Sequence, residues 1–228
     1  MKFGYWKIQG LGQPIRYLIA AANLTEIEQV DYTEFDQWFK EGKPEVAKKS
    51  FFPNLPYLEI KNGSVAITQS RAVLAYLGRS SKFCAANEEE TLRIDVINGA
   101  LDDIWQKFMR LMFDKENFDS NKQKVHDEIL PMLQNVDNYF QKHKYCSGNR
   151  AASWLDFKAL HFFNILFKFS GKFAACENIE KFLQNLLGEF DTVRKCVEEN
   201  DKGRPFMPPG FGAWKYSGGP PGEMVREF

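Results

Sequence analysis

The segment from residue 52 to residue 77 constrains the fold more than any other part of this chain. Pro56 has no backbone N–H for a sheet, so we expect it at the start of a strand, after backbone that stays free to pair with a ligand. Asn62-Gly63 predicts a two-residue hairpin turn. Ser70 precedes an apolar helical run and predicts a helix N-cap, a place that attracts carboxylates. The segment therefore predicts two paired strands and a helix beside a ligand.

The residues before this segment predict a strand, a helix and a second strand. The first strand is expected at residues 2–8, the helix at 14–22 with Pro14 in its first turn, and the second strand around 27–32. A loop of about two dozen residues follows, and loops of that length inside a compact domain are usually functional. The resulting order, βαβ and then ββα, predicts a thioredoxin-like α/β domain.

From residue 88 onward the sequence predicts helices only. Asn87 before three glutamates predicts a helix N-terminus, and Ser153 with Asp156 has capping-box spacing. Pro131 lies inside a helical pattern and predicts a kink. We therefore expect a thioredoxin-like domain over residues 1–80, a linker over 81–87, an all-helical domain over 88–204 and a Gly/Pro-rich tail over 205–228.

The composition limits the partners and the location of the chain. The 30 Lys and Arg residues balance 30 Asp and Glu residues, so the chain has no positive field to hold nucleic acid. No apolar stretch is long enough to span a membrane, and the N-terminus has no signal-peptide pattern. The four cysteines stand far apart without metal-ligand spacing, which favours a reduced, cytoplasmic chain over a disulfide framework or a metal site.

Tyr5 is the candidate for chemistry in the first strand, because the loop after it carries no cysteine for redox reactions. A hydroxyl there can donate to a thiolate that a ligand brings, which lowers the pKa of the thiol. A thiol with a pKa of about 8.5 is only a few per cent ionised at pH 7, and a shift of roughly two units needs about 2.7 kcal/mol. One well-placed hydrogen bond supplies much of that. Taken alone, a tyrosine at a strand end is more often a packing residue.

Ordered motifs in both halves of the chain resemble one family. The motifs are Gly4-Tyr5-Trp6, Gly10-Leu11-Gly12, residues 52–58, residues 68–74, residues 93–96, Ile129-Leu130-Pro131 and Gly148-Asn149. Over residues 1–200 the chain resembles a cytosolic glutathione S-transferase of the mu class with sigma-like features. The resemblance implies a detoxifying transferase that joins the glutathione thiolate to small hydrophobic electrophiles, with glutathione as co-substrate and no metal.

The resemblance also implies how glutathione is held. Tyr5 would stabilise the thiolate, the backbone of Leu55 in a cis Leu55-Pro56 pair would bind the cysteinyl part, and Gln69 and Ser70 would take the γ-glutamyl carboxylate. Trp38 and Lys43 would reach the glycyl carboxylate, and Asn54 would help to fix the peptide. The implied glutathione contacts are Tyr5, Trp6, Leu11, Trp38, Lys43, Asn54, Leu55, Pro56, Gln69, Ser70 and Asp103.

The same resemblance implies a homodimer with shared sites. Asp103 would reach the glutamyl amine of glutathione in the neighbouring subunit, and Phe52 resembles the aromatic key that inserts between helices of the partner. The electrophile pocket is implied at Leu11, Met109 and Phe113. Phe113 stands where mu enzymes place a tyrosine, so no second hydroxyl is expected there.

Simpler interpretations of several residues stay open. Trp38 also fits a role as cover over the core, one of Asp102 and Asp103 is expected on a solvated face, and the three histidines are expected to be structural. A sigma-type glutathione-dependent isomerase is an alternative function. A non-catalytic ligand carrier or structural protein is another, although the presence of Tyr5, Gln69 and Ser70 favours the enzyme.

Overall fold

A four-stranded mixed sheet is the centre of the first half of the chain. The structure, a computed structural model, describes residues 1–207, without the side chains at positions 172, 174 and 200–202. The strands are β1 (Lys2–Trp6), β2 (Glu28–Tyr32), β3 (Tyr57–Ile60) and β4 (Val65–Thr68), in the order β2-β1-β3-β4. β1 pairs in parallel with β2 and antiparallel with β3, which pairs antiparallel with β4. The predicted βαβ-ββα order is therefore confirmed.

Gly4 explains how the two central strands pack so closely. It lies opposite Tyr57 in the register of β1 and β3. A Cβ atom at Gly4 would come within 2.2 Å of Cε1 of Tyr57, so only glycine leaves room for that ring. All four residues of β3 are buried, as expected of a strand that is covered on both faces.

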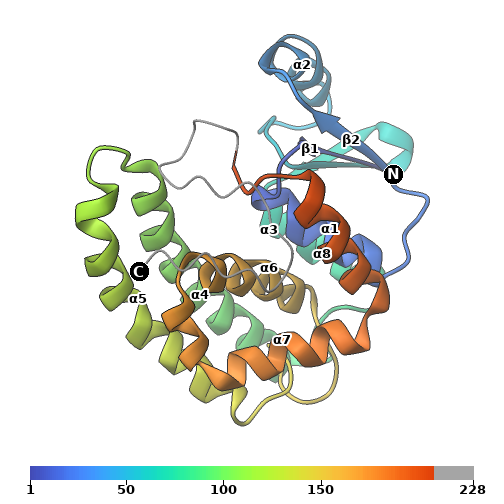
Figure 1. Cartoon of the computed structure of the whole chain (residues 1–228). Helices are drawn as coiled ribbons and strands as arrows, with labels where there is room; N and C mark the ends of the chain where they lie inside the picture. The colour runs from blue at the N-terminus through green and yellow to red at the C-terminus, as the bar shows by residue number, and fades with distance from the viewer. Residues whose placement is uncertain (208–228) are drawn as a thin grey trace.

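Helices cover both faces of the sheet. α1 (Gln13–Ala21) and α3 (Ser70–Ser80) lie side by side and both contact α6, while α2 (Lys43–Ala47) lies on the other side of the sheet (Figure 1). Pro14 stands in the first turn of α1, where its missing N–H costs no hydrogen bond.

Two local predictions were wrong in detail. The long loop after β2 contains a π-helical turn, Gln37–Gly42, followed by α2, and segments this short give little periodicity from which to predict them. The hairpin between β3 and β4 has four residues outside the strands, not two. Its turn is a 3₁₀ turn, Lys61–Gly63, which the hydroxyl of Ser64 closes by donating to the Lys61 carbonyl oxygen at 2.9 Å.

The second half of the described chain is helical, as predicted. Its elements are α4 (Glu88–Phe113), α5 (Phe118–Phe140), α6 (Trp154–Phe169), the 3₁₀ turn Gly171–Ala175, α7 (Glu177–Glu189) and α8 (Asp191–Gly203). α5 continues through Pro131, and the kink there stays a prediction. Most of the predicted tail, residues 208–228, lies outside the described residues.

Side-chain caps fix the starts of two of these helices. Asn87 is the N-cap of α4, and its Oδ1 accepts from the Glu90 N–H at 2.9 Å. At α6 the predicted capping box is present: Asp156 Oδ2 accepts from the N–H of Ser153 at 2.7 Å and from its hydroxyl at 2.8 Å. Oδ1 of Asp156 also accepts from the Cys146 N–H at 2.8 Å. Burial raises the pKa of Asp156 to about 6, against the opposing effect of these hydrogen bonds.

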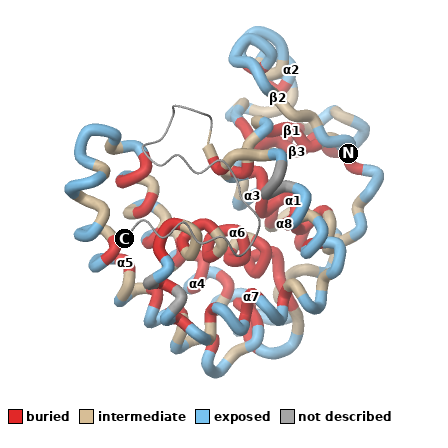
Figure 2. Tube along the Cα trace, in the orientation of Figure 1, coloured by how far each residue is buried: buried red, intermediate tan, exposed pale blue. Residues whose placement is uncertain are grey.

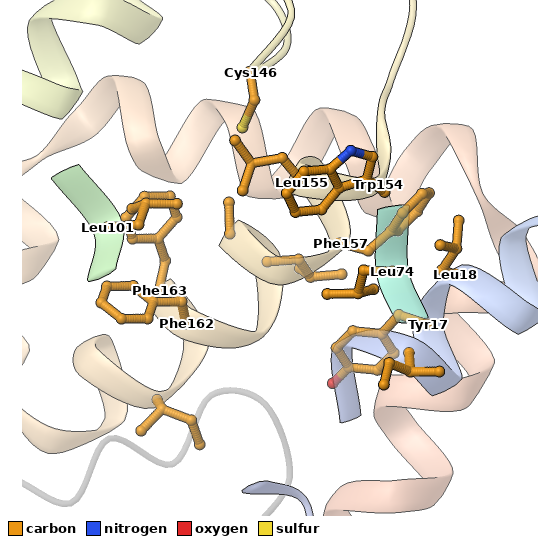
Figure 3. Close-up of a cluster of buried hydrophobic side chains, with 14 of the residues drawn as sticks. Tyr17, Leu18, Leu74, Leu101, Cys146, Trp154, Leu155, Phe157, Phe162 and Phe163 are labelled. Atoms are coloured by element: carbon orange, nitrogen blue, oxygen red, sulfur yellow. The ribbon is translucent and has the colours of Figure 1, made fainter. Parts of the chain in front are cut away.

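α6 connects the two halves of the molecule. Buried positions concentrate along α6 and on the faces of α1 and α3 that meet it (Figure 2). Figure 3 shows Tyr17 and Leu18 of α1 and Leu74 of α3 gathered around Phe157 at the start of α6. The halves therefore share one continuous apolar contact, and we expect them to unfold together.

Replacing Asp156 tests the capping box. Asp156→Ala leaves three buried donors without their acceptor, so we expect the free energy of unfolding in urea to fall by about 3 kcal/mol or more. Asp191→Ala is the control, because its exposed carboxylate pairs with Arg194 on the surface of α8, where solvent screens the pair and little stability depends on it. Equal losses in the two variants would contradict a special role for Asp156.

Candidate functional site

The Tyr5 ring lies in a space that two glycines leave open. Tyr5 is only 6% exposed, and the 3₁₀ turn Gly10–Gly12 passes over it. A Cβ atom at Gly12 would come within 2.3 Å of Cδ1 of Tyr5, and one at Gly10 within 2.6 Å of its hydroxyl oxygen. Gly10 also has a φ of +37°, in the region that favours glycine. The motif Gly10-Leu11-Gly12 therefore packs directly against the Tyr5 side chain, which needs glycine at both ends of the motif.

The Tyr5 hydroxyl is held as a neutral donor. The Leu11 N–H donates to the Tyr5 Oη at 3.0 Å. Burial raises the pKa of Tyr5 above its usual value, while the Leu11 hydrogen bond and the nearby charge of Arg16 oppose that rise. The phenol consequently stays protonated at neutral pH. Because the Leu11 N–H occupies one lone pair of the Tyr5 oxygen, the Tyr5 O–H is left to donate to another acceptor.

Arg16, in α1, fixes the backbone that leads from β1 to this turn. Its guanidinium is almost fully buried and donates to the carbonyl oxygens of Ile8 at 2.9 Å and Trp6 at 3.2 Å. It also pairs with Asp31 of β2 at 3.0 Å. Burial lowers the pKa of Arg16 to about 10, so the group keeps its charge at neutral pH. This arginine was not predicted, because its partners are two backbone carbonyls and a carboxylate 15 positions away on another element.

The Leu55-Pro56 peptide bond is cis, as the resemblance implied. The pair immediately precedes β3, and both residues are buried. The Leu55 N–H donates to Oδ1 of the exposed Asn54 side chain at 2.9 Å. A peptide that takes the Leu55 N–H must therefore replace the Asn54 amide oxygen.

α3 begins beside this segment with a strained residue. Gln69, the N-cap, has a φ of +71°, which is uncommon for a residue with a side chain and is typical of functional turns. Ser70, the predicted N-cap, is instead the first residue of the helix, and the N-cap lies one residue before it. No side chain caps this helix, so its first N–H groups are available to an anion.

One cavity brings the Tyr5 turn and the start of α3 together. It has a volume of about 170 Å³ and lies between the sheet half and the helical half. Gly10 and Leu11 line it on one side and Ser70 on another. The complete lining is Gly10, Leu11, Pro14, Ser70, Arg71, Leu74, Asp102, Trp105, Lys158, His161 and Phe162.

Four polar residues of this lining, Arg71, Asp102, Lys158 and His161, were not predicted as site residues. Lys158 of α6 pairs with Asp102 of α4 at 2.5 Å, and it donates to Asn98 at 2.7 Å. Burial lowers the pKa of Lys158 while the carboxylate of Asp102 opposes this. Burial also lowers the pKa of His161 to about 3, so the ring is neutral. Only the contact between α4 and α6 reveals this group, and no local sequence pattern does.

Other predicted glutathione contacts lie outside this cavity. Trp38 is buried and stacks on Tyr57 with ring centroids 6.1 Å apart, in agreement with the simpler interpretation that it covers the core. Lys43 lies over the ring of Phe39 at 5.5 Å. Trp6 is half-buried, and its ring lies tilted against that of Phe39 with the ring centroids 6.4 Å apart. Their roles toward glutathione stay predictions.

The predicted pocket and dimer residues are spread over the surface. Of the three pocket residues, only Leu11 lines the cavity; Met109 is half-buried on α4, and Phe113 is exposed at its end. Asp103 is exposed and does not line the cavity of its own protomer. Phe52 is 75% exposed. A role for Asp103 and Phe52 therefore needs a second subunit.

The described residues 1–207 hold neither a metal-binding cluster nor a membrane-spanning helix. Among them, no group of three or more His, Cys, Asp or Glu side chains is arranged to hold a metal ion. None of the helices in that part of the chain is both long enough and apolar enough to cross a membrane.

Comparisons with known proteins identify the family. Residues 1–79 match the family model of the glutathione S-transferase N-terminal domain. Glutathione S-transferase Mu 7 of Rattus norvegicus is 30% identical over 215 residues, which cover 91% of this chain and 93% of the relative. Glutathione S-transferase Mu 5 of Homo sapiens is 29% identical over 201 residues, which cover 86% of this chain and 88% of the relative.

Solved structures show the same fold. The glutathione S-transferase Blo t 8 superposes with a TM-score of 0.80 at 22% identity, over 94% of this chain and 99% of that one. The Pi-class enzyme of Onchocerca volvulus gives a TM-score of 0.77 at 21% identity, over 92% and 98%. With relatives this similar over nearly their whole length, the chain belongs to the glutathione S-transferase family.

Proposed function

We propose that this protein joins the thiolate of glutathione to small hydrophobic electrophiles, and that Tyr5 stabilises the thiolate. The observation that carries the proposal is the Tyr5 hydroxyl, which is protonated, buried and fixed by the Leu11 N–H at 3.0 Å. The bound thiol loses its proton to solvent, and the Tyr5 O–H donates to the resulting sulfur anion. The anion then forms a C–S bond to the electrophile, which either releases its leaving group as an anion in a displacement or takes up a proton from solvent in an addition.

The ends of glutathione fit the polar features around the cavity. The γ-glutamyl carboxylate would bind the N-terminus of α3 through Gln69 and Ser70. The cysteinyl backbone would pair with Leu55 once the Asn54 amide oxygen no longer accepts from the Leu55 N–H. Trp38 and Lys43 are proposed for the glycyl end. The electrophile would lie beside Leu11, Met109 and Phe113, an apolar set without a second hydroxyl.

We assign the chain to the mu class on the names of its curated relatives. These relatives do not support the sigma-like features that the sequence suggested, and their names favour the transferase over the isomerase. The structural-protein alternative is also disfavoured, because a non-catalytic chain has no need of a protonated, oriented phenol.

A homodimer in the cytoplasm completes the proposal. Phe52 and its neighbour Phe51 are exposed aromatic residues of one loop, and burying such residues against a second copy is favourable. Asp103 would then contribute to the partner's site. We also propose the domain division at residues 1–80 and 88–204, which agrees with the end of α3 at Ser80 and the start of α4 at Glu88.

Tyr5→Phe is the main test of the function. Removing the hydroxyl deletes the donor to the thiolate, so we expect the pKa of bound glutathione thiol to rise by about one to two units. The rising limb of the pH–activity profile should move to higher pH by the same amount, with little change in glutathione affinity. Thiolate absorbance in the ultraviolet and calorimetry measure the two quantities.

Tyr139→Phe is the matched control for this test, because its hydroxyl makes a part-buried hydrogen bond to the Cys146 carbonyl oxygen at 2.9 Å and the residue does not line the cavity. We expect it to leave the thiol pKa unchanged. The same thiol pKa in the wild type and in Tyr5→Phe would show that the proposed mechanism is wrong.

Gly12→Ala tests the close packing of the glycine turn on the Tyr5 ring. The new Cβ must displace the ring, so we expect kcat/KM with a generic aryl halide to fall about tenfold, the effect of about 1.4 kcal/mol. Gly188→Ala in α7 is the control, because a Cβ there meets nothing within 4 Å. If both variants keep wild-type kcat/KM, the close packing of Tyr5 is not needed for activity.

Phe52→Ser tests the dimer. We expect the wild type to sediment as a dimer at micromolar concentration and the variant to dissociate, because the aromatic anchor is lost from the interface. Phe39→Ser, which changes another exposed phenylalanine outside the predicted interface, should remain dimeric. A monomeric wild type would overturn the proposed assembly.

A further inference from the structure

The chain that leaves α8 pairs with the loop between β1 and the Tyr5 turn. We call residues 204–206 the C-terminal strap. The Gln9 N–H donates to the Pro205 carbonyl oxygen at 2.8 Å, and Gln9 Nε2 donates to that of Arg204 at 2.9 Å. The Gly10 N–H donates to the Phe206 carbonyl oxygen at 3.2 Å. Three successive carbonyls thus hold two successive residues of the loop.

Arg204 anchors the strap to the sheet. Its guanidinium pairs with Oδ2 of Asp31 at 2.6 Å, while Oδ1 of the same carboxylate pairs with Arg16 at 3.0 Å. Asp31 lies in β2 opposite Tyr5 of β1. One carboxylate therefore joins the strap to the arginine that fixes the backbone after β1. α8 itself packs beside α1, which brings the end of the helix to this place (Figure 1).

Phe206 anchors the strap to the helical half. Its side chain is 2% exposed and packs edge-on against Trp105 of α4, with ring centroids 5.8 Å apart. It also contacts Phe108 at 6.2 Å and His161 of α6 at 6.3 Å. Trp105 and His161 line the cavity as well. The strap therefore contacts the sheet half through Arg204 and the helical half through Phe206. Its backbone pairs with the loop at Gln9 and Gly10.

The held residues immediately precede the donor to Tyr5. Gly10 is bonded to the strap, and the next N–H along the chain, that of Leu11, donates to the Tyr5 hydroxyl oxygen. The direction of the Leu11 N–H depends on the peptide plane between Gly10 and Leu11. Glycine leaves that plane free to rotate unless another contact fixes it. The Phe206 carbonyl fixes the preceding peptide plane, between Gln9 and Gly10, and so holds Gly10 on the side from which that rotation starts.

We propose that Arg204 and Phe206 are positioning residues for catalysis. By holding Gln9 and Gly10, they keep the Leu11 N–H on the Tyr5 oxygen, which directs the Tyr5 O–H to the glutathione sulfur. This inference rests on the proposed role of Tyr5. It assigns a function to the start of the segment that the sequence indicated only as a tail.

Phe206→Ala in the full-length protein tests the inference. We expect the pKa of bound glutathione thiol to rise by about half a unit to one unit, the size of one weakened hydrogen bond. kcat should fall with little change in KM for glutathione. Arg204→Gln, which breaks the ion pair and keeps the side chain nearly as long, should shift the thiol pKa in the same direction and serves if Phe206→Ala does not fold.

Phe182→Ala is the matched control. Phe182 is 3% exposed, packs on Phe140 with centroids 4.3 Å apart, and does not contact the strap. We expect it to lower stability without moving the thiol pKa. Combining Phe206→Ala with Tyr5→Phe should add no further pKa shift, because the strap acts through the Tyr5 hydroxyl.

These variants separate the two hypotheses. No pKa shift in Tyr5→Phe itself would refute the proposed function. A shift in Tyr5→Phe with none in Phe206→Ala or Arg204→Gln would overturn the strap inference alone. A shift of the same size in Phe182→Ala, or a further shift in the double variant, would also overturn it, since either result means that the strap acts through general stability.

Discussion

The hydrogen bond from the Leu11 N–H to the Tyr5 oxygen is the interaction on which the site depends. It occupies one acceptor site of the phenol oxygen, which leaves the O–H to donate elsewhere, and it opposes the rise in pKa that burial causes. Its geometry requires a turn with no Cβ at Gly10 or Gly12, since either atom would enter the space of the Tyr5 side chain. The chemistry of one oxygen is thus set by the absence of two side chains.

Burial then decides how the surrounding charges behave. Arg16 keeps its charge although it is buried, because Asp31 pairs with it and carbonyl oxygens accept its N–H groups. His161 has no comparable anionic partner among the described residues and stays neutral. The site therefore has a fixed positive charge behind the phenol, and the imidazole of His161 in the cavity lining is neutral. This arrangement favours a sulfur anion over a neutral thiol.

The parts that the sequence predicted are those with local causes. The capping box of Ser153 and Asp156, the proline before β3 and the helix start at Ser70 each follow from neighbouring residues, and they appear within one position of the prediction. The pair of Lys158 and Asp102 joins different helices, and the contact of Arg204 with Asp31 spans 173 positions, so no pattern along the chain indicates them. α2 was missed because a helix of five residues shows little periodicity.

Asn54 has a consequence for how ligand affinity is distributed. Its amide oxygen accepts from the Leu55 N–H, so a glutathione backbone that pairs with Leu55 as proposed would exchange one acceptor for another at that atom and gain little net free energy there. Selectivity for the length and charge of the tripeptide must then come from its two ends. The middle of the ligand would then set its register in the site, and the two terminal carboxylates would supply most of the binding free energy.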